Sequence, residues 1–117
     1  MRILVCGDRN WTDTTAILRE LFGRRKETEA VIHGAARGAD SLTGLVARSL
    51  KLPVLEFPAL WDKHGLAAGP IRNQRMLDEG RPDLVLAFHA NIAASKGTAD
   101  MLARARKAGI PTEVFTV

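Results

Sequence analysis

The stretch VIHGAARGAD, from Val31 to Asp40, sets a short apolar run against two glycines and an arginine, just before a helical pattern. Gly34 and Gly38 would let the backbone N–H groups of the turn approach an anion closely, because glycine has no side chain. The helix that begins near Arg37 would turn its partly positive N-terminus toward the same anion. The stretch therefore predicts a strand, a phosphate-binding turn and a helix in succession.

Two other turns have a similar composition and also follow apolar runs: CGDR at residues 6–9 and KGT at residues 96–98. None of the three turns has the GxxxxGK[ST] pattern of a P-loop or the GxGxxG pattern of a dinucleotide-binding turn. The prediction of an anion site therefore rests on the repetition of such turns after strand-like runs.

Strand-like and helical patterns alternate along the whole chain. Strands are expected over residues 2–6, 30–33, 54–57, 82–88 and 111–117. Helices are expected after a cap at Thr12 and Asp13, from near Arg37 to before Pro53, and over residues 71–79 and 97–108. The stretch from 58 to 70 breaks this rhythm and predicts a long loop, either a lid over a site or plain irregular packing.

This alternation, with near-continuous apolar strands, predicts one α/β domain over residues 1–117. It favours a three-layer arrangement, with a mainly parallel sheet of about five strands between helices on both faces. In open parallel sheets, ligands bind beyond the carboxyl ends of the strands. The three glycine-containing turns are therefore expected to converge at that edge.

The composition is ordinary for one globular domain: 117 residues, 46% hydrophobic and 26% charged. A formal charge of +4 favours anionic partners such as nucleotides or nucleic acid, although so small a surplus also suits mere solubility. The single cysteine, Cys6, excludes an internal disulfide and is expected in the core. His33, His64 and His89 are spread over different segments, so no metal site and no cofactor is predicted.

No run approaches the roughly 20 apolar residues of a membrane span. The chain opens directly on the strand-like RILVCG, without a basic leader, a long apolar segment and a cleavage site. We therefore expect a cytoplasmic protein that does not contact a membrane.

Several motifs in fixed order closely resemble the DUF2493 family of YspA/YpsA-related proteins: GDRNW, HGAARGAD, AGPIRNQRML, KGTADM and AGIP. That family belongs to the SLOG superfamily of Rossmann-like proteins. The superfamily includes the LOG phosphoribohydrolases, which release a base from a nucleoside monophosphate, and the DprA proteins, which load recombinase onto single-stranded DNA. The resemblance implies a Rossmann-like domain that binds a nucleotide or a nucleotide-derived ligand, as a sensor or a processing module.

The resemblance also bears on catalysis. The Gly97-Thr98 pair matches the GT of the LOG motif PGGxGTxxE, but Met101 stands where that motif has its catalytic glutamate. Asp100 precedes that position by one residue, which turns it by about 100° around the helix. An N-glycosidic hydrolase needs a carboxylate to activate water or to stabilise an oxocarbenium-like centre. The candidates for that role are Asp40 and Asp100.

Arginine can bind two phosphate oxygens at once, so the basic residues in or beside the glycine-containing turns are candidates for phosphate binding. Thr98 can place its hydroxyl on a phosphate or cap the last helix. Asp40 can accept hydrogen bonds from ribose hydroxyls, orient Arg37 or stabilise the start of its own helix. The predicted ligand- and phosphate-binding residues are Gly7, Arg9, Gly34, Arg37, Gly38, Arg72, Lys96, Gly97 and Thr98.

Trp11 follows the first turn and Trp61 lies in the long loop, so each can stack on a base or pack in a core or an interface. The leading hypothesis is binding of a nucleotide-like small molecule. A second is DprA-like binding of single-stranded nucleic acid by the same arginines along a longer groove. A third is an oligomeric interaction module in which Trp61 packs against another copy; a homo-oligomer is expected.

Overall fold

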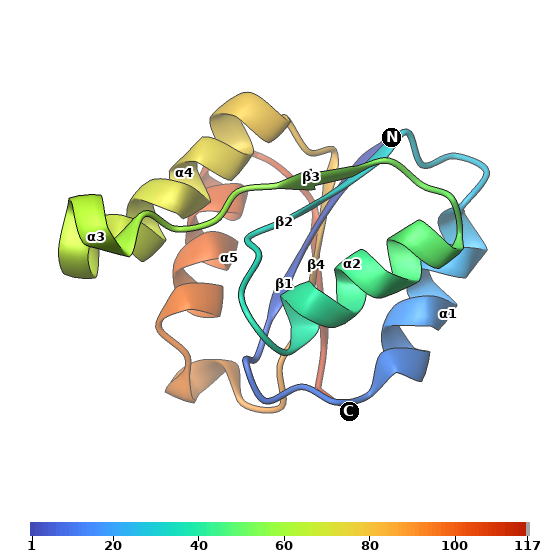
Figure 1. The fold of residues 1–117 in the computed structure, drawn as a ribbon, viewed down its shortest axis with the longest axis horizontal. Helices are drawn as coiled ribbons and strands as arrows, with labels where there is room; N and C mark the ends of the chain where they lie inside the picture. The colour runs from blue at the N-terminus through green and yellow to red at the C-terminus, as the bar shows by residue number, and fades with distance from the viewer. Residues whose placement is uncertain (117) are drawn as a thin grey trace.

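The computed structural model describes residues 1–116, which form a five-stranded sheet between two layers of helices. The strands are β1 (Arg2–Gly7), β2 (Ala30–His33), β3 (Val54–Glu56), β4 (Leu84–Phe88) and β5 (Thr112–Phe115). The helices are α1 (Thr14–Arg24), α2 (Ala39–Ser49), α3 (Trp61–His64), α4 (Ala68–Gly80) and α5 (Gly97–Lys107), with short 3₁₀ turns η1 (Gly65–Ala67) and η2 (Ile92–Ala94). The prediction of an α/β domain with alternating strands and helices is confirmed (Figure 1).

The strands are all parallel and lie in the order β3-β2-β1-β4-β5. The chain moves outward from β1 through β2 to β3, then crosses back to β4 on the other side of β1. The direction of winding therefore reverses between β1 and β4. In open parallel sheets, this reversal leaves a crevice at the carboxyl ends of the two strands, where ligands bind.

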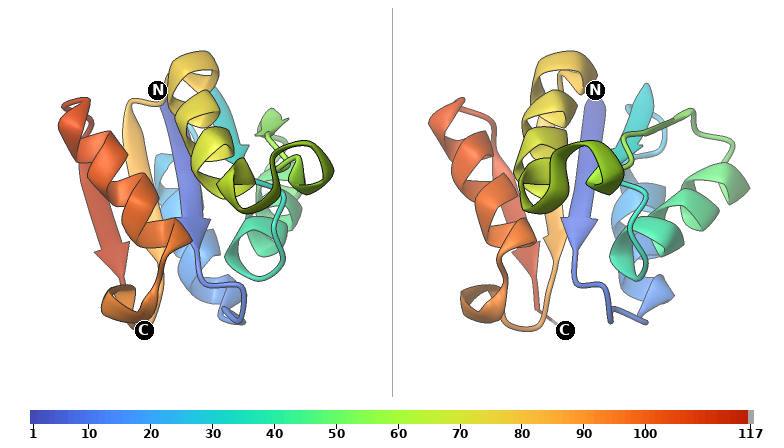
Figure 2. Two further views of the ribbon diagram at one scale, coloured as in Figure 1. Left: turned by 90° about the vertical axis from the view of Figure 1, so that its left-hand side faces the viewer. Right: turned by 60° about the vertical axis from the view of Figure 1, so that its left-hand side comes forward.

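The sheet is covered on both faces, α1 and α2 on one and α4 and α5 on the other (Figure 2). Side chains of β1 alternate between the two cores: Ile3 and Val5 pack with α1 and α2, whereas Leu4 and Cys6 pack with α4 and α5. Cys6 is buried, as predicted. Burial on both faces explains why the sequences of β1 and β4 are continuously apolar.

The stretch from 58 to 70, which the sequence predicts as a loop, is more ordered than that. It contains α3 and η1, and α4 begins at Ala68, three residues before the predicted start at Ile71. Pro70 is compatible with this start because the first N–H groups of a helix have no partner within it. The short α3 lies at one end of the molecule, beyond the carboxyl edge of β3 (Figure 1).

Strand boundaries also differ from the predictions. β4 begins at Leu84 and not at Pro82, and β3 ends at Glu56 and not at Phe57. β5 spans Thr112–Phe115, and the predicted extension to Val117 lies outside the described residues. Of the helices in residues 1–116, none combines the length and the apolar composition that a membrane crossing demands.

Glycines let the turns at the carboxyl edge pack directly on one another. Ala39 N–H donates to the carbonyl of Asp8 at 3.0 Å, which joins the start of α2 to the loop after β1. Gly38, the residue before Ala39, has φ +73°, and a Cβ built on it would lie 2.4 Å from the carbonyl oxygen of Asp8. A Cβ on Gly7 would lie 2.2 Å from the carbonyl oxygen of Phe88. Packing of the turns therefore requires glycine at both positions.

We predict that Gly38→Ala lowers the free energy of unfolding by more than about 2 kcal/mol, because it adds left-handed strain to a steric overlap. The matched control is Gly23→Ala, since Gly23 lies in α1 with no atom within 4 Å of its Cβ position. That change should be neutral or stabilise by up to about 1 kcal/mol. Urea denaturation measures both, and equal stability of the two variants would contradict the packing described.

Candidate functional site

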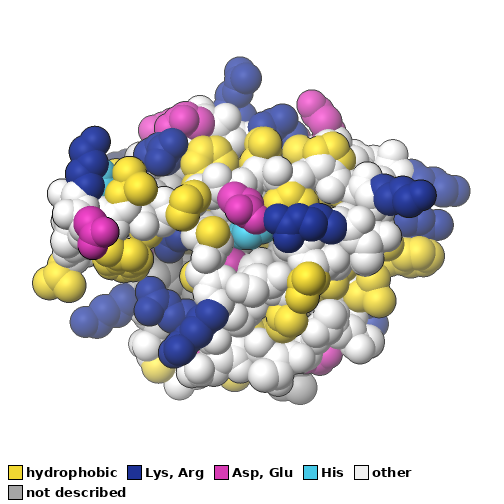
Figure 3. All heavy atoms as spheres, in the orientation of Figure 1, with side chains coloured by type: hydrophobic (Ala, Val, Ile, Leu, Met, Phe, Trp, Pro, Cys, Tyr) yellow, Lys and Arg dark blue, Asp and Glu magenta, His cyan; other side chains and the backbone are white. Residues whose placement is uncertain are grey.

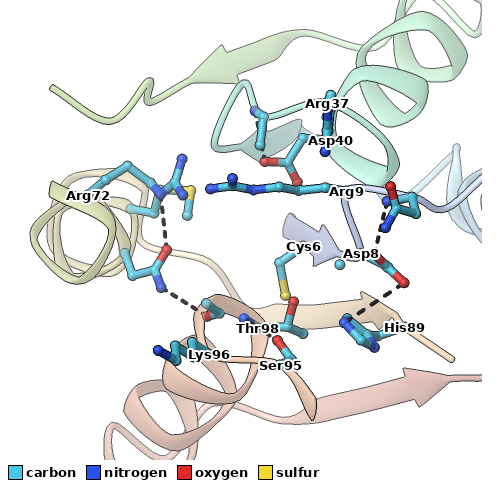
Figure 4. Close-up of a pocket in the computed structure, with 16 residues that line it drawn as sticks. Cys6, Asp8, Arg9, Arg37, Asp40, Arg72, His89, Ser95, Lys96 and Thr98 are labelled. Atoms are coloured by element: carbon cyan, nitrogen blue, oxygen red, sulfur yellow. Dashed lines mark hydrogen bonds and ion pairs between the residues drawn. The ribbon is translucent and has the colours of Figure 1, made fainter. Parts of the chain in front are cut away.

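A cavity of about 350 Å³ opens at the carboxyl ends of β1 and β4 (Figure 4). Its lining comes from the loop after β1, the turn before α2, the start of α4 and the turn before α5. The structure thus brings the three glycine-containing turns to one place. The predicted ligand-binding residues in the lining are Gly7, Arg9, Arg37, Arg72, Lys96, Gly97 and Thr98.

Two predicted residues lie just outside this lining. Gly34 lines an adjoining cavity, and a Cβ there would lie 2.2 Å from Nη1 of Arg72. Gly38 lines another hollow, which shares Arg9 and Arg37 with the main cavity. Both glycines act by shaping the turn and making room for its neighbours.

Arg72 is the best anchored cation of the site. Its Nη1 donates to the carbonyl of Gly34 at 2.5 Å, and its Nε donates to Oδ1 of Asn73 at 3.0 Å. Burial lowers the pKa of Arg72, Asp40 opposes that change and Arg9 adds to it. Arginine nevertheless keeps its charge in proteins. A fixed positive charge therefore lies between the end of β2 and α4.

Asn73 continues this chain of contacts into α5. Its Nδ2 donates to the carbonyl of Gly97 at 3.2 Å and to Oδ2 of Asp100 at 3.0 Å. Nε of Arg104 donates to the same Asp100 oxygen at 2.8 Å. The Asp100 carboxylate thus holds α4 against α5 and is not part of the cavity lining.

Asp40, unlike Asp100, is part of the cavity lining. It lies in the first turn of α2, is only 7% exposed and accepts a hydrogen bond from Ala36 N–H at 3.2 Å. Figure 4 shows the Arg9 side chain running past the Asp40 carboxylate toward Arg72. Burial raises the pKa of Asp40 to about 6, although Ala36 N–H, Arg72 and Arg9 all favour the charged form. Asp40 is therefore a carboxyl group that changes charge near neutral pH, inside the cavity.

The remaining cations, Arg9, Arg37 and Lys96, are exposed at the mouth of the cavity. Within residues 1–116 none of the three forms an ion pair with a carboxylate. In the space-filling view, Lys and Arg side chains gather around a hollow at the lower left (Figure 3). The site therefore carries positive charge that is open to an external anion.

The start of α5 adds to this environment. Lys96 is the cap residue of α5, and Thr98 N–H, in the first turn, donates to Oγ of Ser95 at 3.0 Å. No atom outside its chain neighbours lies within 4 Å of a Cβ built on Gly97, which leaves open space beside the partly positive helix N-terminus. Gly97 is thus a glycine at which an anion can approach the backbone.

Several lining residues were not among the predicted site residues, including Cys6, Asp8, His89 and Ser95. Asp8 accepts from Asn10 N–H at 2.9 Å and lies 4.0 Å from Nε2 of His89. The position of His89 directly after β4 is a signal that could have been used, as is a serine shortly before a helix. The first signal is the same rule about strand ends that identified the glycines, and the second is the preference for serine near helix starts.

The two tryptophans differ in exposure and in what they contact. Trp11 is 8% exposed, packs edge-on against Phe88 with ring centroids 5.7 Å apart, and donates from Nε1 to the carbonyl of Asp13. Trp61 is 48% exposed, and the Arg9 guanidinium lies 6.0 Å from its ring centroid. Core packing therefore accounts for Trp11, whereas the Trp61 ring is free to contact a ligand.

The raised pKa of Asp40 predicts a pH dependence of stability. The unfolded value is about 3.9, so between about pH 4 and the folded value of about 6 the folded state binds more protons. The free energy of unfolding should therefore fall as the pH rises through this window. Asp40→Asn removes this titration. Its free energy of unfolding, relative to that of the native chain, should therefore rise by about 2 kcal/mol between pH 4 and pH 7.

Urea denaturation at the two pH values measures this difference. Asp62→Asn is the control, since Asp62 is an exposed carboxylate on α3. Any part of the pH effect that Asp62→Asn shares with Asp40→Asn comes from the loss of a carboxylate in general and not from burial at residue 40. A pH-independent difference for Asp40→Asn would contradict the burial of an ionisable carboxylate at this position.

Comparison with known proteins identifies the family and the fold of this chain. Residues 1–64 match the profile of the YspA, cpYpsA-related SLOG family, YAcAr. The Gene 61 protein of Mycobacterium phage D29 is 35% identical over 122 residues, which cover 97% of this chain and 95% of that protein. Residues 1–64, which match the family profile, contain both the turn after β1 and the turn before α2.

Two solved structures share the fold at low sequence identity. DNA processing protein A (DprA) from Streptococcus pneumoniae matches with a TM-score of 0.62 and 13% identity, over 98% of this chain and 59% of the DprA chain. UDP-GlcNAc 2-epimerase from Neisseria meningitidis, bound to UDP-GlcNAc, matches with a TM-score of 0.58 and 16% identity, over 97% of this chain and 31% of the epimerase. The chain therefore has a Rossmann-like fold and belongs to the YspA, cpYpsA-related SLOG family.

Proposed function

We propose that this protein binds a nucleotide or a nucleotide-derived ligand in the cavity between the ends of β1 and β4, with Arg9, Arg37, Arg72 and Lys96 on the phosphate. The observation that carries the proposal is the convergence of these cations, none of which is within ion-pair distance of a carboxylate in residues 1–116. Family membership and the DprA-like fold agree with a role connected to nucleotides or nucleic acid.

The cations differ in how they are held, and this suggests how they act. Arg72 is fixed by Gly34 and Asn73 before any ligand arrives, so little freedom is lost when it binds a phosphate. Arg9 and Arg37 are exposed and can close over the phosphate with paired N–H groups. The open backbone at Gly97 gives the anion access to the start of α5.

Asp40 gives the same cavity a hydrogen-bond acceptor for ribose hydroxyls. If the ligand is cleaved, Asp40 is also the group that we assign to the chemistry of N-glycosidic hydrolysis, as the base that activates water. Asp100 is bound by Asn73 and Arg104, so it supplies no free carboxylate to the cavity, and the methionine at residue 101 has none. Release of free base from nucleoside monophosphates, and its loss in Asp40→Asn, tests this assignment.

The second candidate function is binding of single-stranded nucleic acid. It is favoured by the similarity to DprA over 98% of this chain and by the exposure of Arg9 and Arg37. Affinity would then grow with oligonucleotide length and fall steeply with salt, because counterions are released from many phosphates. If the site is instead a pocket for a single nucleotide, affinity should stop increasing once the ligand is one or two nucleotides long.

Two other expectations from the sequence stay predictions: a cytoplasmic location and assembly into a homo-oligomer. Leu66 is 96% exposed on η1, beside the half-exposed Trp61, and would belong to a surface that contacts a second copy. Light scattering at several protein concentrations measures the oligomeric state.

We predict that Arg37→Ala weakens binding of nucleoside mono- and diphosphates by about 1 to 3 kcal/mol, the scale of a lost charged hydrogen bond. Stability should be unchanged, because Arg37 is exposed. Arg106→Ala is the matched control, since Arg106 is an exposed arginine in the last turn of α5, at the opposite end of that helix from the cavity. Isothermal titration calorimetry measures the affinities, and equal affinities for the two variants would overturn the phosphate assignment.

A further inference from the structure

A second cavity adjoins the first and shares three of its four cations. Its volume is about 500 Å³, and its lining includes Gly34, Pro58, Ala59 and Trp61. The residues that line both cavities are Arg9, Ala36, Arg37 and Arg72. The three arginines therefore lie at the boundary between the two cavities.

The two cavities differ in chemistry. The second contains the exposed ring of Trp61 with Pro58 and Ala59 beside it, and its lining has no carboxylate. Such a surface suits a planar base, which stacks on an aromatic ring without needing specific polar partners. The placement of the Arg9 guanidinium 6.0 Å from the Trp61 ring centroid links this surface directly to the cations.

The first cavity offers polar partners. Asp40 and Asn73 line it, together with Ser95 and Thr98 from the turn before α5. Asp40 is the acceptor best suited to hydroxyl groups, since it is buried and its carboxyl faces the cavity (Figure 4). These groups suit a sugar or another hydroxyl-rich moiety.

We propose that the ligand is a two-part nucleotide joined by a diphosphate, either a dinucleotide or a nucleotide sugar. The base lies against Trp61, the diphosphate lies across Arg9, Arg37 and Arg72, and the second moiety enters the cavity of Asp40. This inference rests on the proposed nucleotide function and names its ligand class. A mononucleotide would fill one cavity and leave the other empty, whereas a diphosphate matches the charge of several cations placed between two hollows.

The test compares ligands of increasing extent on the full chain by isothermal titration calorimetry. The probes are NAD and UDP-glucose as two-part diphosphates, AMP and UMP as mononucleotides, and ribose 5-phosphate as a fragment without a base. We expect at least one two-part diphosphate to bind ten times more tightly than the mononucleotide with the same base. Ribose 5-phosphate should bind more weakly than both.

Variants of Trp61 separate the base subsite from the phosphate site. Trp61→Ala should lower the affinity for the two-part ligand by about tenfold, the scale of lost base stacking. The affinity for ribose 5-phosphate should change less than twofold. Trp61→Phe should restore most of the affinity. Lys63→Ala is the control for a change on the same segment, since Lys63 is exposed on α3 and lines neither cavity.

The outcomes distinguish the inference from the proposed function beneath it. If AMP or UMP binds as tightly as the two-part ligands, and Arg37→Ala weakens that binding, the diphosphate inference is overturned while nucleotide binding stands. An unchanged affinity in Trp61→Ala overturns the base subsite in the same way. If no probe binds in the millimolar range, both the inference and the proposed function are overturned.

Discussion

The contact between the Arg72 guanidinium and the backbone at Gly34 is the constraint on which the site depends. Nη1 of Arg72 reaches the Gly34 carbonyl at 2.5 Å through the space that a side chain at residue 34 would occupy. Asn73, the next residue, carries the connection to Gly97 and Asp100 in α5. One pair of adjacent residues on α4 thus joins the end of β2 to the start of α5 across the reversal point of the sheet.

This arrangement places positive charge where the fold leaves a crevice. The reversal between β1 and β4 would produce an opening in any sheet of this topology. Here Arg72 is held at one wall of the opening, Arg9 and Arg37 lie at its mouth, and Asp40 is buried inside it. Burial raises the pKa of Asp40 to about 6, and carboxyl groups with a raised pKa are common at binding and catalytic sites.

Much of this could be predicted from the sequence, because strand periodicity and glycine position are local signals. The alternation of strands and helices and the convergence of residues 7–9, 34–38 and 96–98 follow from those signals. The sequence left Trp11 open between base stacking and core packing, and its packing against Phe88 is a tertiary contact that a local pattern does not show. The contacts of Asp100 with Arg104 and Asn73 could not be predicted, because Asn73 lies on another helix. The order within residues 58–70 was also missed, because α3 is too short to show a helical period.

The most direct test of the nucleotide site is a ¹⁵N NMR titration of the protein with a nucleoside diphosphate. If the phosphate binds at the edge described, the amide signals that shift most will be those of Arg9, Arg37, Gly97 and Thr98, while the signals of the last turns of α1 and α5 will stay in place. Saturating shifts confined to those turns would support the site. Shifts that map elsewhere on the surface, or none at millimolar nucleotide, would contradict it.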